Sequence, residues 1–369
     1  MKRLWPTGLA IREGCANAAS GRRMAVTICA GVALVVCGVG LANALEVSSL
    51  VESEQRWIDD GAFVLVVESA PTDSGGGVAV AACDRLAQVD GIDASFAVTV
   101  TDRTAQPANA PGTHATLALA SPGVYEFLGA PVPAGAGVLV PPQVADDTGL
   151  ADTESTQLTI EHPGERSDRV PVTAVLVEGT VLGEQLVGAY VLPAMLSGRS
   201  SQCYVRSDAA HIDGVRTYVR TALAAADGTP AVAHPRLTEN AYGLDFTTAY
   251  DSRVLRWAWA AGAAVLVSLW ALLQWTRRAR WAIYATFGAD RRARLTMQSA
   301  EWFSLSVVGA VWGWGTAVAL AIGLGADVHV SVVQVTGQLV ATWCVGSLGV
   351  VAVGLAPVGT LLDALKDRT

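Results

Sequence analysis

The stretch Met24–Leu45 reads MAVTICAGVALVVCGVGLANAL and contains no charged residue. A helix rises about 1.5 Å per residue, so about 20 apolar residues cross the roughly 30 Å hydrocarbon layer of a membrane. Ala42-Asn43-Ala44 resembles the cleavage site of a signal peptide. The apolar run before it is longer than the about 7–15 residues of such a peptide. We therefore predict that this stretch is an uncleaved membrane anchor.

Other segments of the chain have the same character. The 369 residues are 51% hydrophobic and only 16% charged, whereas an ordinary soluble protein carries about 25% charged residues. Tryptophan, which is favoured at membrane interfaces, stands at the ends of several of these segments. The further predicted spans are Val254–Trp275, Trp302–Leu324 and Val332–Leu355. The sequence therefore predicts an α-helical membrane protein with four transmembrane helices.

Charge is distributed unevenly along the chain. The stretch Leu45–Ser252 holds 27 of the 33 acidic residues but only 10 of the 25 basic ones, a formal charge of −17, while the remainder carries +9. Basic residues cluster before the first span and between the second and third, and short loops rich in Lys and Arg stay on the cytoplasmic side. We therefore expect a multi-pass protein of the cell membrane with both termini inside and residues 46–251 outside. No nucleic-acid partner is expected, because the large domain has no basic face.

The predicted domain order follows from the spans and their orientation. The parts are a cytoplasmic amphipathic lead (1–23), the first transmembrane helix (24–45), an extracytoplasmic domain (46–251), the second transmembrane helix (254–275), a cytoplasmic loop (276–301), the third and fourth transmembrane helices (302–324 and 332–355) and a cytoplasmic tail (356–369).

Residues 46–251 have the pattern of an α+β domain inserted between the first and second transmembrane helices. Glu46–Asp60 has helical composition and is expected to continue the first span outward as a stalk. Helices are predicted at Val78–Val89 and Val215–Asp227, a loop at Thr104–Pro111, and all helices on one side of a sheet. The predicted strands are Ala62–Ala70, Ala94–Thr101, Thr116–Leu119, Gly137–Val140, Gln157–Glu161, Val170–Leu176 and Leu186–Leu192.

Cys83 and Cys203 are the only cysteines in the predicted outer domain. Disulfides persist outside the cell, so a bridge between these two residues is one interpretation. Two buried thiols are the other, because the sequence does not show that their Cα atoms approach within about 7 Å. The sequence leaves these alternatives open.

No catalytic, cofactor-binding or metal-ligating residue is expected. The sequence contains no CxxC or HExxH metal motif, no GxSxG nucleophile elbow and no GxxxxGK[ST] phosphate-binding loop. We therefore expect that the chain is not an enzyme and that any ATP is bound by another subunit. Charged residues are absent from the middle of the spans, which disfavours ion conduction. Arg256 and Glu301, near span ends, are interpreted as snorkelling side chains.

The loop after the second span reads RRARWAIYATFGADRRAR from Arg277 to Arg294. Its first part is composed of helix-forming residues, with Trp281, Tyr284 and Phe287 spaced to lie on one face. Gly288 follows as a helix stop. The residue pattern alone favours two interpretations equally: an interfacial anchor, or a docking element for a cytoplasmic partner.

With this loop the sequence resembles the FtsX/MacB-like ABC transporter permeases, and the resemblance covers nearly its whole length. In that family the loop typically runs R-R-R-E-x-x-x-L-R-A-L-G-A-S-R-R. This sequence has Phe287 in place of Leu and Asp290, a natural N-cap for the next helix, in place of Ser. Arg280 stands where Glu is usual. The matching residues are Arg277, Arg278, Gly288, Ala289, Arg291 and Arg292.

Four other stretches are similar to the family. Gly8–Arg23 looks like its amphipathic lead, and Gly354–Arg368 resembles the exit from its fourth span. Leu117–Gly129 and Gly137–Leu150 are similar to its MacB-like outer core domain. Their order and spacing, more than any single motif, carry the resemblance.

The resemblance implies a homodimer in membrane lipid, with a separate cytoplasmic ABC ATPase that binds the ATP. A coupling helix would sit in a cleft of the ATPase, and its residues would be Arg277, Arg278, Trp281, Tyr284, Phe287 and Gly288. ATP-driven motion would then reach the outer domain by mechanotransmission and export or extract an amphiphilic substrate: a lipid, peptide, lipoprotein or drug. The alternative is an FtsX-type signalling scaffold that activates an envelope hydrolase.

Overall fold

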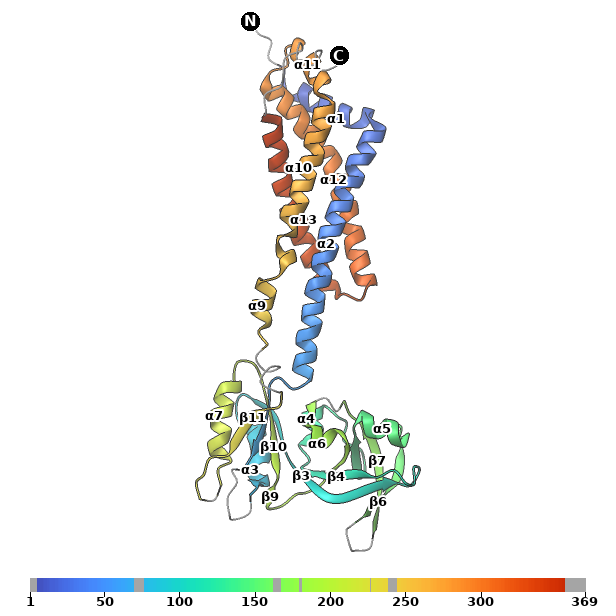
Figure 1. The fold of residues 1–369 in the computed structure, drawn as a ribbon, viewed down its shortest axis with the longest axis vertical. Helices are drawn as coiled ribbons and strands as arrows, with labels where there is room; N and C mark the ends of the chain where they lie inside the picture. The colour runs from blue at the N-terminus through green and yellow to red at the C-terminus, as the bar shows by residue number, and fades with distance from the viewer. Residues whose placement is uncertain are drawn as a thin grey trace. The chain divides into compact units, whose positions relative to one another are not determined.

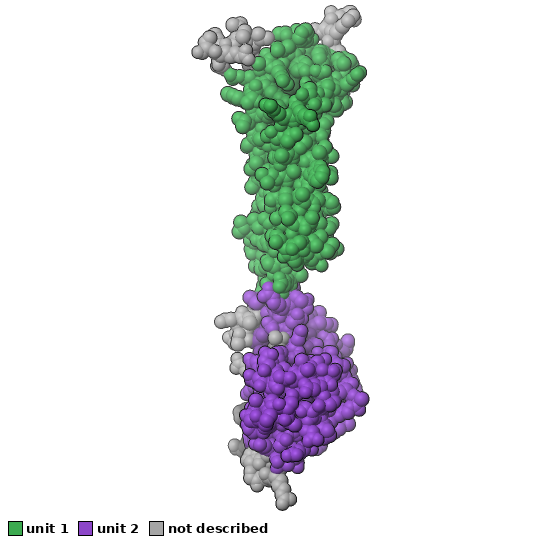
Figure 2. All heavy atoms as spheres, turned by 90° about the vertical axis from the view of Figure 1, so that its right-hand side faces the viewer, with its two compact units in different colours: residues 1–53, 245–369 green, residues 54–244 purple. Residues whose placement is uncertain are grey.

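The computed structural model describes residues 5–69, 76–161, 167–178, 181–225, 227–237 and 244–355. The predicted cytoplasmic tail, 356–369, lies outside these residues. The chain divides into two compact units, which Figure 2 colours separately: unit 1 comprises Met1–Ser53 and Asp245–Thr369, and unit 2 comprises Glu54–Leu244. Each unit is described by itself.

Unit 1 is helical. Among the described residues, four helical segments are long and apolar enough to cross a membrane, as the sequence predicts. They run side by side, with α1 and α11 at one end of the bundle (Figure 1). The bounds are α1 Thr7–Ser20, α2 Arg22–Asp59, α9 Phe246–Asp251, a 3-10 turn Val254–Trp257, α10 Ala258–Thr276, α11 Arg278–Thr286, α12 Arg291–Gly323 and α13 Val328–Leu355.

Small residues let α2 and α12 approach closely. A Cβ added to Gly309 would stand 2.5 Å from the carbonyl oxygen of Cys29, and one added to Gly313 would stand 2.6 Å from that of Ala33. The GxxxG spacing of this chain therefore serves a contact between two helices of the same chain. Beside it, the indole rings of Trp270 and Trp302 meet edge to face at a centroid distance of 5.3 Å.

Unit 2 is built on a nine-stranded mixed sheet of order β11-β1-β10-β3-β4-β8-β5-β7-β6. Its strands are β1 Val64–Glu68, β3 Ile92–Pro107, β4 Ala115–Ala120, β5 Gly137–Val140, β6 Ser155–Glu161, β7 Asp168–Leu176, β8 Ala189–Pro193, β10 Gln202–Ser207 and β11 Val232–Pro235. A separate two-stranded sheet pairs β2 Val78–Ala79 with β9 Arg199–Ser200. The helices are α3 Val80–Arg85, continued by a 3-10 turn Leu86–Gln88, α4 Val124–Leu128, α5 Pro142–Thr148, α6 Glu184–Val187 and α7 Ile212–Ala222.

One end of the sheet closes into a ring. Strand β3 pairs with β10 along its first half and with β4 before and after a shift in register, and the residues from Thr104 to Pro107 also pair with β6. The order β3-β4-β8-β5-β7-β6 therefore returns to β3. Every strand of this ring contributes to one buried cluster that includes Leu117, Leu158 and Tyr190, so the ring has a filled core.

Three predictions for this domain are wrong: the start of one loop, the start of one strand, and the placement of all helices on one side of the sheet. The predicted loop Thr104–Pro111 begins inside β3, because pairing with β6 extends that strand to Pro107. The predicted strand Leu186–Leu192 begins within helix α6, and β8 starts only at Ala189.

The third wrong prediction is that all helices lie on one side of the sheet. The structure has helices on both faces. Because side chains alternate along a strand, Val64 and Val66 of β1 join a cluster with α4 and α6, whereas Leu65 and Val67 join one with α3 and α7.

Cys83 and Cys203 are joined by a disulfide. Their Cα atoms lie 6.0 Å apart, and both side chains are fully buried. Cys83 belongs to α3 and Cys203 to β10, an inner strand between β1 and β3, so the bond holds the helix against the sheet. The cysteines Cys15, Cys29, Cys37 and Cys344 are free.

Candidate coupling site on helix α11

Helix α11, Arg278–Thr286, is a short segment between two breaks in the chain. At its end Gly288 takes a φ of +80°, its N–H donates to Ala285, and the N–H of Ala289 donates to Tyr284 over 3.0 Å. These two bonds form a Schellman motif, which needs a left-handed residue at that point. The next helix is capped by Asp290, whose carboxylate accepts the N–H of Ala293 at 2.8 Å. Gly288 therefore ends α11, and Asp290 begins the next helix.

Trp281 anchors α11 to the bundle. Its side chain is only 5% exposed and packs with Ala10 of α1 and Met297 of α12. The indole N–H donates to Oε1 of Gln274 on α10 over 2.7 Å. A buried indole needs such an acceptor, so Gln274 holds the ring in one orientation.

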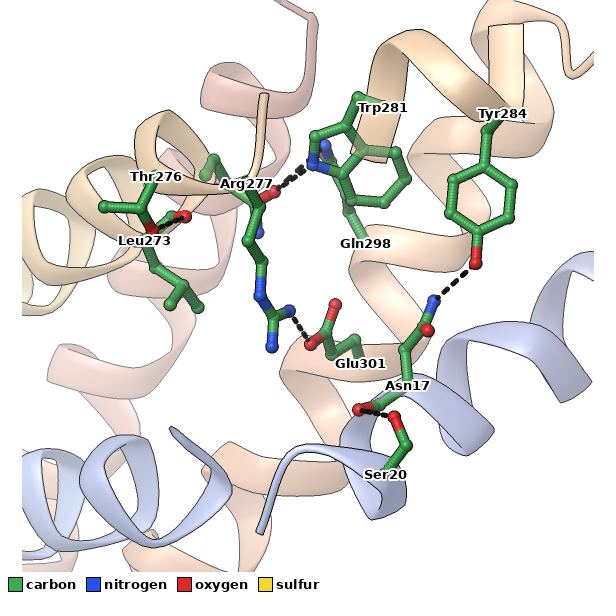
Figure 3. A network of polar contacts seen from close by, with 10 residues as sticks. Asn17, Ser20, Leu273, Thr276, Arg277, Trp281, Tyr284, Gln298 and Glu301 are labelled. Carbon is green, nitrogen blue, oxygen red and sulfur yellow. Dashed lines mark hydrogen bonds and ion pairs between the residues drawn. The ribbon is translucent and has the colours of Figure 1, made fainter. Parts of the chain in front are cut away.

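Tyr284 ties α11 to α1. Its hydroxyl donates to Oε1 of Glu13 over 2.7 Å. It also accepts from the amide of Asn17 over 3.3 Å (Figure 3). Desolvation by burial raises the pKa of Tyr284, which keeps the hydroxyl protonated and able to donate. Trp5, just before α1, packs edge-on against the phenol ring at 6.2 Å between centroids.

Arg277 and Glu301 form a buried ion pair beneath α11 (Figure 3). Their side chains are 9% and 1% exposed. The interpretation of Glu301 as a snorkelling side chain is therefore wrong: α12 carries it inward, where a carboxylate needs the guanidinium for compensation. Arg256 is half exposed and pairs with Asp251 over 3.2 Å.

Phe287 is the aromatic residue that α11 leaves uncovered, with 74% of its surface exposed. The prediction that Trp281, Tyr284 and Phe287 share one face for docking is wrong, because α1 covers the first two. Phe287 lies just beyond the last helical residue. Ile283, which the spacing of aromatic residues in the loop does not mark, is 52% exposed on α11. Arg278 lies over the ring of Trp275 at 5.2 Å.

Two site residues could not be selected from the loop alone. Gln274 and Gln298 lie on α10 and α12 and are both 8% exposed, and the amide of Gln298 lies 3.5 Å from Oε1 of Gln274. The sequence signal for Gln274 is that it is the only amide side chain in the predicted span Val254–Trp275. Such a side chain is costly in lipid unless it finds partners within the bundle.

Unit 2 has a separate cavity of about 440 Å³. Apolar side chains such as Phe63 and Leu128 line part of it, and the charged residues Asp93, Arg206 and Asp208 line another part. The guanidinium of Arg206 lies 4.6 Å from the centre of the Phe127 ring. Within the described residues, no group of three or more His, Cys, Asp or Glu could hold a metal ion.

No protein-family model and no curated protein matches this chain. The solved structures similar to it include the following three. The periplasmic region of MacB from Actinobacillus actinomycetemcomitans has a TM-score of 0.35 and 7% identity, over 53% of this chain and 97% of that one. A domain of a putative permease from Porphyromonas gingivalis has a TM-score of 0.33 and 15% identity, over 48% and 93%.

The third is the extracellular domain of the noncanonic ABC-type transporter YknZ from Gram-positive bacteria, with a TM-score of 0.29 and 14% identity over 42% of this chain and 88% of that one. The sequence of this chain resembles the FtsX/MacB-like ABC transporter permeases, and the solved structures similar to it include outer domains of MacB and of an ABC-type transporter.

Proposed function

We propose that this chain is the permease subunit of an ABC transporter, working with a separate cytoplasmic ATPase. The four long helices span the cell membrane, unit 2 is extracytoplasmic, and two copies form the transporter. The observation that carries the proposal is the construction of α11: a short helix clamped by buried Trp281 and by partly buried Tyr284 that leaves Phe287 exposed. A rigidly held helix with an exposed aromatic side chain suits docking into a cleft of a partner.

The contacts of α11 supply routes by which motion of the ATPase reaches the bundle. Tyr284 bonds to Glu13 on α1, and Trp281 bonds to Gln274 on α10. Helix α1 in turn lies tightly on α12, since a Cβ on Gly14 would stand 2.5 Å from the carbonyl oxygen of Met297. If the ATPase displaces α11, these contacts break unless α1, α10 and α12 move with it.

Helix α2 would carry this motion further along the chain. It runs unbroken from Arg22 to Asp59, which is 38 residues. At about 1.5 Å per residue it is about 57 Å long, against about 30 Å of hydrocarbon. The excess length supports transmission of movement from the membrane region toward the outer domain, which is mechanotransmission.

The substrate in this proposal is amphiphilic and is exported or extracted. The cavity of unit 2 supports this class, because it combines apolar walls such as Phe63 and Leu128 with charged groups such as Asp93 and Arg206. An amphiphile presents both kinds of surface, and each would meet a matching wall.

The test is co-purification of the ATPase with the full-length chain. Phe287→Asp places a charge in the docking contact, so we expect ATPase recovery to fall at least about tenfold, a loss of about 1.4 kcal/mol. Val132→Asp is the matched control, because Val132 is 73% exposed and lies in unit 2. Both variants should insert into membranes normally. Undiminished recovery with Phe287→Asp would contradict the docking role.

A further inference from the structure

A cleft of about 630 Å³ lies in unit 1 where two pairs of helices join. One wall is the junction of α1 and α2, from Gly21 to Met24, and the other is the junction of α10 and α11, from Thr276 to Arg280. Four arginines line it: Arg22, Arg23, Arg277 and Arg280. No acidic side chain is among the described residues that line it.

The charge of this cleft is not compensated within the described residues. Arg22, Arg23 and Arg280 are exposed, and none of them forms an ion pair with a described carboxylate. Arg277 is neutralised by Glu301, so the lining has an excess of three positive charges. Helices α2 and α11 both begin here, and the first amides of a helix attract an anion.

Arg277 presents one end of its guanidinium to the cleft. The residue is 8% exposed, and its Nε is buried and bonds to no described atom. The other end of its guanidinium faces the cleft, since Nη2 lies 3.5 Å from the place that a Cβ on Gly21 would take. An anionic oxygen in the cleft would meet this end of the guanidinium, where a charge-assisted hydrogen bond is stronger than one between neutral groups.

The surroundings favour a lipid as the source of that oxygen. Trp275 directly precedes the cleft residue Thr276 and is 68% exposed; Val26, just after Met24, is 63% exposed. Exposed apolar side chains beside a cluster of arginines match a molecule with acyl chains next to an anionic headgroup. A free inorganic anion would use the arginines but not these side chains.

We propose that this cleft binds the phosphodiester headgroup of an anionic phospholipid, bridging the start of α2 and the start of α11. The site requires the four helices to lie in a membrane, but it does not require the partner ATPase. Undiminished ATPase recovery with Phe287→Asp would therefore contradict the proposed docking role and leave the lipid site standing, whereas absent lipid binding would overturn the lipid site and leave the docking role standing.

The test is titration of the purified full-length chain in a neutral detergent, with bound molecules counted by native mass spectrometry. The probes are phosphatidylglycerol, phosphatidylcholine with the same acyl chains, and inorganic phosphate. We expect phosphatidylglycerol to bind and the other two to bind at least about tenfold more weakly, which is about 1.4 kcal/mol. Equal binding of phosphatidylcholine, or of inorganic phosphate, would overturn the assignment to an anionic lipid.

Matched variants locate the site. Arg23→Gln/Arg280→Gln removes two cleft charges from exposed side chains and should weaken phosphatidylglycerol binding about tenfold. Arg12→Gln/Arg292→Gln removes the same charge from exposed residues outside the cleft lining and should leave binding unchanged. If both double variants weaken phosphatidylglycerol binding equally, binding depends on the total positive charge of the chain and not on the cleft, which would overturn the proposed site. Arg23→Lys/Arg280→Lys keeps the charge and should retain most of the binding.

Discussion

Arg277 and Glu301 form an ion pair in which the carboxylate side chain is 1% exposed and the guanidinium side chain 9% exposed. Arg277 stands between α10 and α11, and Glu301 lies on α12, so the pair joins the base of the candidate coupling helix to the bundle. Burying two charges is unfavourable unless each meets the other, and the pair therefore defines one relative placement of these helices.

Removal of one partner should destabilise the chain strongly. Glu301→Ala leaves the buried guanidinium of Arg277 without its carboxylate, and such a loss costs about 3–5 kcal/mol. The measurement is the thermal unfolding midpoint of the purified protein in detergent. Arg277→Met/Glu301→Leu removes both charges and should recover most of the midpoint. A midpoint unchanged by Glu301→Ala would show that the pair is not buried as described.

Gly288→Ala should destabilise the turn after α11. The φ of +80° costs a residue with a Cβ about 1–2 kcal/mol, and no atom stands within 4 Å to add a clash. Gly315→Ala is the control, because Gly315 lies within α12 and a Cβ there also meets nothing. Alanine favours helix, so this control should raise the unfolding midpoint. Shifts of the same sign would contradict the left-handed turn.

Loss of the disulfide should destabilise unit 2. Cys83 and Cys203 are separated by 120 residues, and a cross-link over a loop of that size contributes about 4–5 kcal/mol in the chain-entropy description. We expect Cys83→Ala/Cys203→Ala to lower the unfolding midpoint of this unit, and reductant to lower that of the unmodified chain to the same value. Cys15→Ser, at an exposed free cysteine, should change neither. Reductant that leaves the midpoint in place would argue against the bond.

Asp208 and His211 in unit 2 should show a linked pH dependence. Their side chains lie 2.8 Å apart, which raises the pKa of His211 and lowers the pKa of Asp208. The histidine contribution to stability is present below its unfolded pKa and is lost as pH rises through the folded value. The aspartate contribution is present above its unfolded pKa and is lost as pH falls through the folded value. The pair therefore contributes between the two folded pKa values.

The measurement for this pair is an NMR titration of the histidine ring in the full-length chain. Asp208→Asn should lower the pKa of His211, while Glu161→Gln, beside His114, should leave His211 unchanged. An unaltered titration of His211 in Asp208→Asn would exclude the contact.

The sequence by itself determined the features that depend on neighbouring residues along the chain. Long apolar stretches such as Met24–Leu45 identify helices able to cross a membrane, because the required length follows from the rise of one helix. Gly288 and Asp290 likewise mark the end of one helix and the start of the next, since each acts on backbone groups within a few residues.

Only the tertiary structure decided which side chains are covered and by what. Trp281 and Phe287 are both aromatic residues of one short segment, yet α1 and α12 bury the first and leave the second exposed. The partner of Glu301, the pairing that extends β3 to Pro107 and the approach of Cys83 to Cys203 are also contacts between distant parts of the chain. Such contacts depend on how whole elements pack, and a local pattern does not contain that information.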